Sequence, residues 1–245
     1  MKKLPSGTAL EVFETLDSTS TEAKRRVDAG EAGPVWILAL SQTAGYGRRG
    51  RGWEQRAGDF AGTLLLTPEA PTERWGQLSF VVALALASSL DEVVPESKIA
   101  LKWPNDLLID GRKCAGILLE NLGRQLSVGI GVNIVSAPEG LAYPVARLVD
   151  HAAEPPAPAE MAVSIDDHFW RLYRQWLTQG FASIRGGWLA RAAGIGSEIA
   201  VRLPNEELKG VFDGIDETGA LMLRSAAGTR TIAAGDVFFT PQGQG

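Results

Sequence analysis

The sequence predicts an α/β (α+β) protein in which a mixed-sheet domain over residues 1–190 is followed by a small all-β domain over residues 191–245. In the first part, short apolar runs typical of buried strands alternate with helical patterns. After Gly196 the chain changes to short alternating segments separated by turn residues, a texture typical of a small all-β domain. With 245 residues, 45% hydrophobic and 22% charged, the chain is long enough for one or two domains with a real core.

The first elements follow the order strand, helix, strand. Residues 10–16 (LEVFETL) alternate in character like a strand, and residues 35–41 (VWILALS) form a short apolar run like a buried strand. Between them, Thr19-Ser20-Thr21-Glu22 matches a capping box and predicts a helix start, and Gly30 is a plausible stop.

The middle of the chain predicts a central helix and a run of strands. Residues 78–94 are apolar on nearly every face, as expected of a helix that is covered on all sides. Asp110-Gly111 is a tight-turn signal between two strands. The strands expected here are residues 99–103, 107–110, 113–120 and 126–134.

A Pro-rich break at residues 152–160 precedes an amphipathic helix and then the all-β segment. Its apolar residues at helical spacing are expected in the core; they are Ile165, Phe169, Leu172, Tyr173 and Trp176. The short strands expected after the helix are residues 198–203, 208–215, 220–225, 229–234 and 236–240.

Composition excludes several classes of function. The net charge of −5 and pI near 5.2 have the wrong sign for a protein that wraps nucleic acid. The single cysteine, Cys114, excludes an internal disulfide and a Cys-rich zinc site. Neither a signal peptide nor a membrane helix of ~20 apolar residues is visible, so we expect a soluble, cytoplasmic protein with no membrane or DNA partner.

Residues 41–53, SQTAGYGRRGRGW, contain the pattern G-x-G-x-x-G but lack its usual context. A dinucleotide-binding turn needs a helix to follow it, and the glycines at positions 52, 58 and 62 disfavour one. The glycines instead allow close approach to a ligand, and Arg48, Arg49 and Arg51 suit a phosphate or carboxylate. The loop predicts a mobile lid over an anion; a solvated surface loop or an RNA-contacting segment are the alternatives.

Two lysines accompany a turn in the same domain. Lys102 begins the sequence KWPND, and Lys113 follows on the next expected strand, so the two lie on neighbouring segments of a predicted hairpin. A lysine beside a turn is normally a solvated charge. Two of them, together with an arginine-rich loop, favour an anionic ligand.

Five ordered segments together resemble the signature segments of biotin protein ligases, the biotin–[acetyl-CoA-carboxylase] ligase family. They are DSTS (17–20), QTAGYGRRGRGW (42–53), KWPND (102–106), GRKCAGILLE (111–120) and GIGVNI (129–134). The resemblance implies a mixed-sheet catalytic domain followed by a small SH3-like β-barrel. It also implies a short form without the N-terminal DNA-binding domain, because the first catalytic strand begins near Leu10.

The family activates biotin with ATP and Mg²⁺ to give biotinyl-5′-AMP, then transfers biotin to a lysine of a biotin carboxyl carrier protein or domain. The resemblance assigns catalytic roles to Lys113 and Arg48. It assigns biotin binding to Ser18, Thr19, Ser20, Gln42, Gly45, Tyr46, Gly47, Arg48, Lys113, Gly116, Gly129 and Gly131. It assigns ATP binding to Arg48, Arg51, Trp53, Lys102, Asn105 and Asn133. No protein metal ligand is expected, and the protein is expected to be a monomer or homodimer.

Competing interpretations apply to several of these residues. Thr19 also fits a helix cap, Trp53 also fits a core position, and the glycines also fit turns or bulges. Cys114 fits a small buried strand residue better than a nucleophile, because no base is near it in the sequence. Tyr46 departs from the family, which often has arginine there, and its ring is expected to cover biotin.

Two alternative functions also fit parts of the sequence. Lipoate–protein ligase shares the fold and the adenylation chemistry but differs in the signature segments. An RNA-binding module would use the Arg-Gly loop, although it needs a wider basic field than the composition offers.

Overall fold

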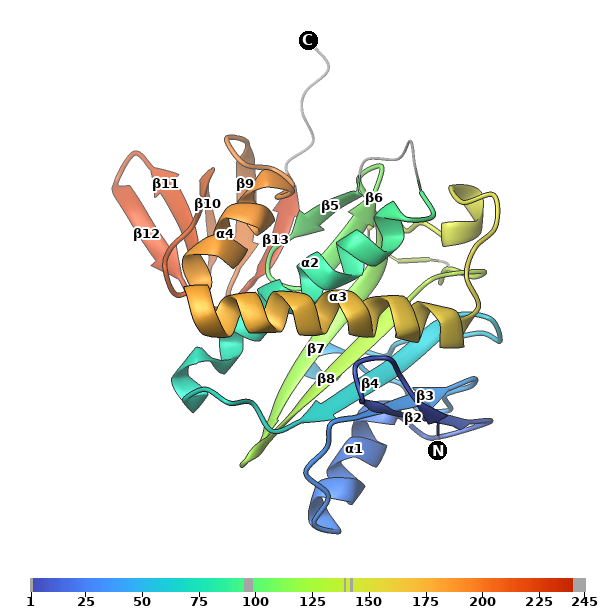
Figure 1. Cartoon of the computed structure of the whole chain (residues 1–245). Coiled ribbons are helices and arrows are strands. Elements are labelled where there is room, and N and C mark those ends of the chain that lie inside the picture. The colour runs from blue at the N-terminus through green and yellow to red at the C-terminus, as the bar shows by residue number, and fades with distance from the viewer. Residues whose placement is uncertain (1, 95–98, 139, 142, 240–245) are drawn as a thin grey trace.

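The computed structural model describes residues 2–94, 99–138, 140–141 and 143–239, in which an eight-stranded sheet, four α-helices and a five-stranded sheet are arranged as Figure 1 shows. The expected α+β organisation is confirmed. Among the described residues, no helix is both long and apolar enough to cross a membrane.

The large sheet is mixed, because β2 and β3 pair in parallel and the other neighbours pair antiparallel. Its spatial order is β1 (Lys2–Lys3), β2 (Ala9–Phe13), β3 (Val35–Ala39), β4 (Phe60–Leu66), β8 (Gln125–Val132), β7 (Arg112–Leu122), β6 (Asp106–Ile109) and β5 (Ile99–Lys102). The strands in the middle of the sheet, β3, β4 and β8, are almost entirely buried, which explains why their sequences are apolar runs.

Helices cover both faces of this sheet, and the alternation of side chains along β3 shows which helix covers which face. Val35 and Ile37 pack in one cluster with Ala23 of α1 (Thr19–Asp28). Trp36 and Leu38 point the other way, into the main core with α2 (Leu78–Asp91) and α3 (Pro158–Gln179). Figure 1 shows α2 and α3 lying across one face of the sheet.

The central helix α2 is confirmed, and its burial on nearly every face follows from its position between the sheet, α3 and α4 (Phe181–Ala190). The predicted amphipathic helix is α3, which buries Ile165, Phe169 and Trp176. Helix α4 was not predicted, because Gly186 and Gly187 weaken its helical signal.

The C-terminal strands form an antiparallel sheet in the order β12 (Gly228–Ile232), β11 (Leu221–Ser225), β10 (Glu207–Ile215), β9 (Glu198–Arg202) and β13 (Asp236–Phe239). This sheet is the small all-β domain that was expected as an SH3-like barrel. It is joined to the large sheet, since Trp103 Nε1 donates to the Gly219 carbonyl at 3.0 Å and residues 191–193 bond to Leu101 of β5. The expected boundary at residue 190 falls between α4 and β9.

Several local predictions are corrected. Helix α1 begins at Thr19 as expected, but the capping box is wrong: the N-cap is Ser18, which makes no side-chain cap hydrogen bond, and the Thr19 hydroxyl donates to Gln42 instead. The strand expected over residues 10–16 is β2, which covers Ala9–Phe13, and the two-residue strand β1 before it was not expected. Lys102 and Lys113 do not share a hairpin, since β6 lies between β5 and β7. The predicted Asp110-Gly111 turn is confirmed, with φ of 48° and 74°.

Candidate active site

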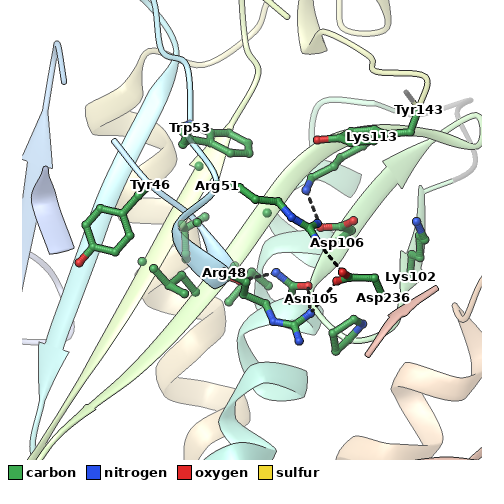
Figure 2. A pocket seen from close by; sticks show the side chains of 18 of the residues that line it. Tyr46, Arg48, Arg51, Trp53, Lys102, Asn105, Asp106, Lys113, Tyr143 and Asp236 are labelled. Carbon is green, nitrogen blue, oxygen red and sulfur yellow. Dashed lines mark hydrogen bonds and ion pairs between the residues drawn. The ribbon is translucent and has the colours of Figure 1, made fainter. Parts of the chain in front are cut away.

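A cavity of about 420 Å³ lies on the α1 face of the large sheet. It runs from the N-terminus of α1 across β8, β7 and β6 to the Lys102 end of β5, and all four residues of β13 complete it. The side chains around its charged end are shown in Figure 2. The cavity therefore spans both sheets of the molecule.

The floor of the cavity is formed by glycines on two neighbouring strands. Gly116 of β7 is paired with Gly131 of β8, and Gly129 lies two residues away on the same face. A Cβ on Gly131 would collide with the Trp53 indole, and one on Gly129 would lie 2.9 Å from Ser20 Oγ. A side chain at Gly131 or Gly129 would therefore displace Trp53 or Ser20, both of which line the cavity.

Neutral polar groups gather where α1 meets β4 and β8. The Thr19 hydroxyl donates to Gln42 Oε1 at 3.2 Å, and the Thr19 backbone N–H donates to the same oxygen at 2.8 Å. Thr63 Oγ1 donates to Thr19 Oγ1 at 2.8 Å and lies 3.4 Å from Ser20 Oγ. The network is uncharged and mostly buried, so it suits a neutral ligand group that both donates and accepts hydrogen bonds.

The opposite end of the cavity is charged. Lys113 Nζ forms an ion pair with Asp106 at 2.7 Å, and Lys102 lies on the neighbouring strand beyond Asp106. Burial lowers the pKa of Lys102, and the positive charge of Lys113 acts in the same direction, while Asp106 opposes both. The cavity lining contains four cations (Arg48, Arg51, Lys102 and Lys113) and two carboxylates (Asp106 and Asp236), so this end attracts anions.

The Gly-rich loop borders this charged end. The Gly47 N–H donates to the Arg51 carbonyl at 2.8 Å, and the Trp53 N–H donates to the Gly45 carbonyl at 2.9 Å, which closes the loop on itself. Arg48 donates to Asn105 Oδ1 at 3.2 Å, as Figure 2 shows. Burial lowers the pKa of the Arg48 guanidinium, and the negative charge of Asp236 opposes this.

Tyr46 lies at the side of the cavity away from the charged cluster (Figure 2). Its hydroxyl accepts a hydrogen bond from Lys24 Nζ at 2.8 Å and donates to Glu120 at 3.1 Å. Lys24 and Glu120 are also an ion pair at 2.8 Å. The hydroxyl is therefore occupied by protein groups, which leaves the ring as the part of Tyr46 available to a ligand.

The structure brings together all but two of the site residues expected from the sequence. Those lining the cavity are Ser18, Thr19, Ser20, Gln42, Tyr46, Gly47, Arg48, Arg51, Trp53, Lys102, Asn105, Lys113, Gly116, Gly129 and Gly131. Gly45 lines a neighbouring hollow instead. Asn133 is buried beside the cavity, where its side chain donates to the Ala146 carbonyl at 3.3 Å.

Some residues of the cavity lining were not expected from the sequence. Asp236, Phe238 and Phe239 come from β13, and Tyr143 comes from the segment after β8. Lys102 lies near the rings of both phenylalanines, and Lys113 lies 5.6 Å from the Tyr143 ring. The available signal in the sequence was the adjacent pair Phe238-Phe239, since neighbouring residues of a strand point to opposite faces and only one of the two can enter the core of a half-buried sheet.

Comparison with known families assigns both parts of the chain. Residues 12–134 match the biotin/lipoate A/B protein ligase family, and residues 194–240 match the biotin protein ligase C terminal domain. The chain belongs to the biotin protein ligase family. The second model is named for biotin protein ligases alone, and it covers the C-terminal sheet.

Individual relatives agree with this family. A biotin–[acetyl-CoA-carboxylase] ligase of Paracoccus denitrificans is 44% identical over 240 residues, covering 91% of this chain and 97% of the relative. A protein of the same name from Mycobacterium tuberculosis is 32% identical, covering 93% and 88%. The fold is similar to that of the Aquifex aeolicus biotin protein ligase in complex with biotin and ATP, with a TM-score of 0.84, 24% identity and coverage of 95% and 98%.

Proposed function

We propose that this ligase joins biotin to ATP to form biotinyl-5′-AMP and pyrophosphate, and then transfers biotin to one lysine of a biotin carboxyl carrier protein or domain. The observation that carries the proposal is the division of one cavity into a neutral hydrogen-bonding end at α1 and a cationic end at β5–β7. Biotin has a neutral ureido ring at one end and a carboxylate at the other, which matches this division.

The first step brings the biotin carboxylate against the α-phosphate of ATP. An oxygen of the carboxylate attacks phosphorus, and the bond to the pyrophosphate oxygen breaks. Both reactants are anions, so the site must offset their repulsion with positioned cations. Lys113, held by Asp106 at 2.7 Å, faces the reacting groups, while Arg48, Arg51 and Lys102 face the phosphates.

In the second step the amine of the acceptor lysine attacks the carbonyl carbon of the mixed anhydride, an amide forms, and AMP leaves. Lys113 and Arg48 stabilise the charge on the departing phosphate. The Gly-rich loop excludes water from the anhydride during the interval between the two steps.

ATP reacts as its magnesium complex in this proposal. Mg²⁺ keeps several waters and takes one or two carboxylates in addition to phosphate oxygens, and it neutralises phosphate charge when bound. Across the described residues no group of three or more acidic, His or Cys side chains forms a metal cage. Mg²⁺ would therefore be held mainly by phosphate oxygens and water, and Asp106, which lines the cavity and pairs with Lys113, would be the carboxylate beside it.

The two alternatives fit the cavity less well. The dithiolane ring of lipoate has no N–H or C=O to pair with the network of Thr19, Gln42 and Thr63. An RNA-binding module needs a wide basic field, but the chain has a net charge of −5.

Mass spectrometry of a biotin carboxyl carrier domain tests the function. Incubation with the enzyme, ATP, Mg²⁺ and biotin is expected to add one biotin, and the same carrier with its acceptor lysine changed to arginine is the matched control. Lipoate in place of biotin is expected to give no product. A carrier that keeps its mass in the complete reaction, or that gains lipoate instead, contradicts the proposal.

A further inference from the structure

Three arginines of the Gly-rich loop meet one carboxylate from the C-terminal sheet. Arg49 pairs with Asp236 at 2.9 Å, Arg51 pairs with the same carboxylate, and Arg48 lies 3.8 Å from it. Arg48 also donates to the neighbouring Gly235 carbonyl at 3.4 Å. The Asp236 side chain is only 12% exposed, whereas Arg51 is 60% exposed, so the carboxylate is the fixed centre of this cluster.

The three arginines share Asp236 as their ion-pair partner. Within the part of the chain that the structure describes, Asp236 is the only carboxylate in ion-pair distance of Arg48, Arg49 or Arg51. The second carboxylate of the cavity, Asp106, is paired with Lys113. Asp236 therefore provides the negative charge that offsets three neighbouring guanidinium groups.

Guanidinium forks bind carboxylate and phosphate oxygens in the same way. Asp236 and Arg51 both line the cavity (Figure 2). The carboxylate therefore pairs with arginines that an anionic ligand in the cavity can also reach. A phosphate chain carries more charge than one carboxylate and can compete for these arginines.

We propose that Asp236 is a positioning residue that holds the Gly-rich loop against the C-terminal sheet in the empty enzyme. The phosphates of the nucleotide then replace the Asp236 carboxylate as the partner of the loop arginines. This inference rests on the proposed function, because it requires Arg48 and Arg51 to bind nucleotide phosphates. Loss of the Asp236 carboxylate should therefore have two effects, one on the order of the empty loop and one on nucleotide affinity. Removing the carboxylate loosens the empty loop, and it also removes a competitor for the nucleotide.

The experiment compares the wild type with Asp236→Asn and with Asp213→Asn, which breaks a similar Asp–Arg ion pair with Arg224 elsewhere in the same sheet. Trypsin cleavage after Arg48, Arg49 and Arg51 is mapped by mass spectrometry without ligands. Binding of α,β-methylene-ATP, which cannot form an adenylate, is measured by calorimetry at saturating biotin and Mg²⁺. Thermal melting checks that each variant is folded.

We expect Asp236→Asn to be cleaved faster in the loop and to bind the analogue about fivefold more tightly, the size of effect that losing a partly exposed ion-pair cluster allows. Asp213→Asn should match the wild type in both assays. A purely structural role for Asp236 would weaken analogue binding, so the direction of the change separates the two roles.

Arg49→Gln gives a second route if Asp236→Asn does not fold. Arg49 is 40% exposed and does not line the cavity, and its loss removes one partner of Asp236. Cleavage after Arg51 should rise in this variant. The inference is overturned if loop cleavage is unchanged in both variants, or if a folded Asp236→Asn binds the analogue no more tightly than the wild type. Either result leaves the proposed function intact. A wild-type enzyme that binds no analogue overturns the proposed function together with it.

Discussion

Cys114 is fully buried on β7, beside the cavity but outside its lining. Burial raises the pKa of its thiol to about 12, because the thiolate would lose its hydration, and the negative charge of Asp59 adds to this. At pH 8 only about one molecule in ten thousand then carries a thiolate. We expect iodoacetamide to leave the native protein unlabelled and to label it fully in urea, as read by intact mass. Rapid native labelling would show that this strand opens.

In the proposed mechanism, the adenylation step depends most on Lys113. Its loss removes the cation nearest Asp106 and the reacting carboxylate, and losing one such donor typically costs ~100-fold in rate. Lys113→Ala should therefore release pyrophosphate at least ~100-fold more slowly. Because the lysine is partly exposed, the variant should remain folded, which circular dichroism checks. Near wild-type release from a folded variant would remove Lys113 from the mechanism.

Substitutions at Tyr46 distinguish the contribution of its ring to biotin affinity from that of its hydroxyl. The hydroxyl bonds only to Lys24 and Glu120 among the described residues, so its removal should leave the biotin affinity nearly unchanged. Tyr46→Phe is expected to bind biotin like the wild type, whereas Tyr46→Ala should lose ~1 kcal/mol or more of apolar contact. Calorimetric titration with biotin measures both, and three equal affinities would place the ring away from the ligand.

At the scale of elements, the sequence predicts well what is decided locally. The apolar run of α2 and the Asp110-Gly111 turn each depend on neighbours in the chain, and both predictions are confirmed. Strand β4 was not predicted, because its start, Phe60-Ala61-Gly62, follows a glycine-rich loop that hides a strand pattern. Its place beside β8 is decided by long-range pairing, which no local pattern records.

A substitution at Gly131 on β8 tests whether ATP binding requires a glycine in the cavity floor. A Cβ there collides with the Trp53 ring, so Gly131→Ala must displace the indole, to which the family resemblance assigns ATP binding. We expect ATP affinity to fall by at least about tenfold, with a stability loss of about 1–3 kcal/mol from overpacking. Gly186→Ala is the matched control, because it has open space within helix α4 and should stabilise the fold by about 0.5–1 kcal/mol. Equal ATP affinities would place Trp53 away from the nucleotide.

At the scale of the whole molecule, the two sheets share one site, and this could not be predicted from sequence. Asp236 meets Arg49 across 187 residues of chain, and a single aspartate at the start of a short strand carries no signal of that contact. The signature segments predicted most of the cavity on the large sheet because each is contiguous. The contribution of β13 depends on how the C-terminal sheet docks, through contacts such as Trp103 with Gly219.

The docking of the two sheets also places aromatic side chains beside the buried Lys102. Its ammonium group lies 5.9 and 5.4 Å from the rings of Phe238 and Phe239, and burial lowers its pKa from the ordinary 10.5. A lysine binds phosphate only while protonated, which holds below its pKa, so nucleotide affinity should fall as the pH rises through this lowered value. Lys102→Arg stays charged throughout, since the pKa of arginine exceeds about 12, and should lack this fall.

Phe239→Ala, which admits water to Lys102, should move the fall toward higher pH because hydration favours the ammonium form. Calorimetric titration of α,β-methylene-ATP between about pH 7 and pH 10, in the range below the ordinary lysine pKa, measures all three proteins. Lys102 acts as the titrating group only if the wild-type fall is absent from Lys102→Arg and displaced in Phe239→Ala. Identical profiles for the three proteins would show that another group titrates, and that docking of the C-terminal sheet does not set the charge at the phosphate end of the cavity.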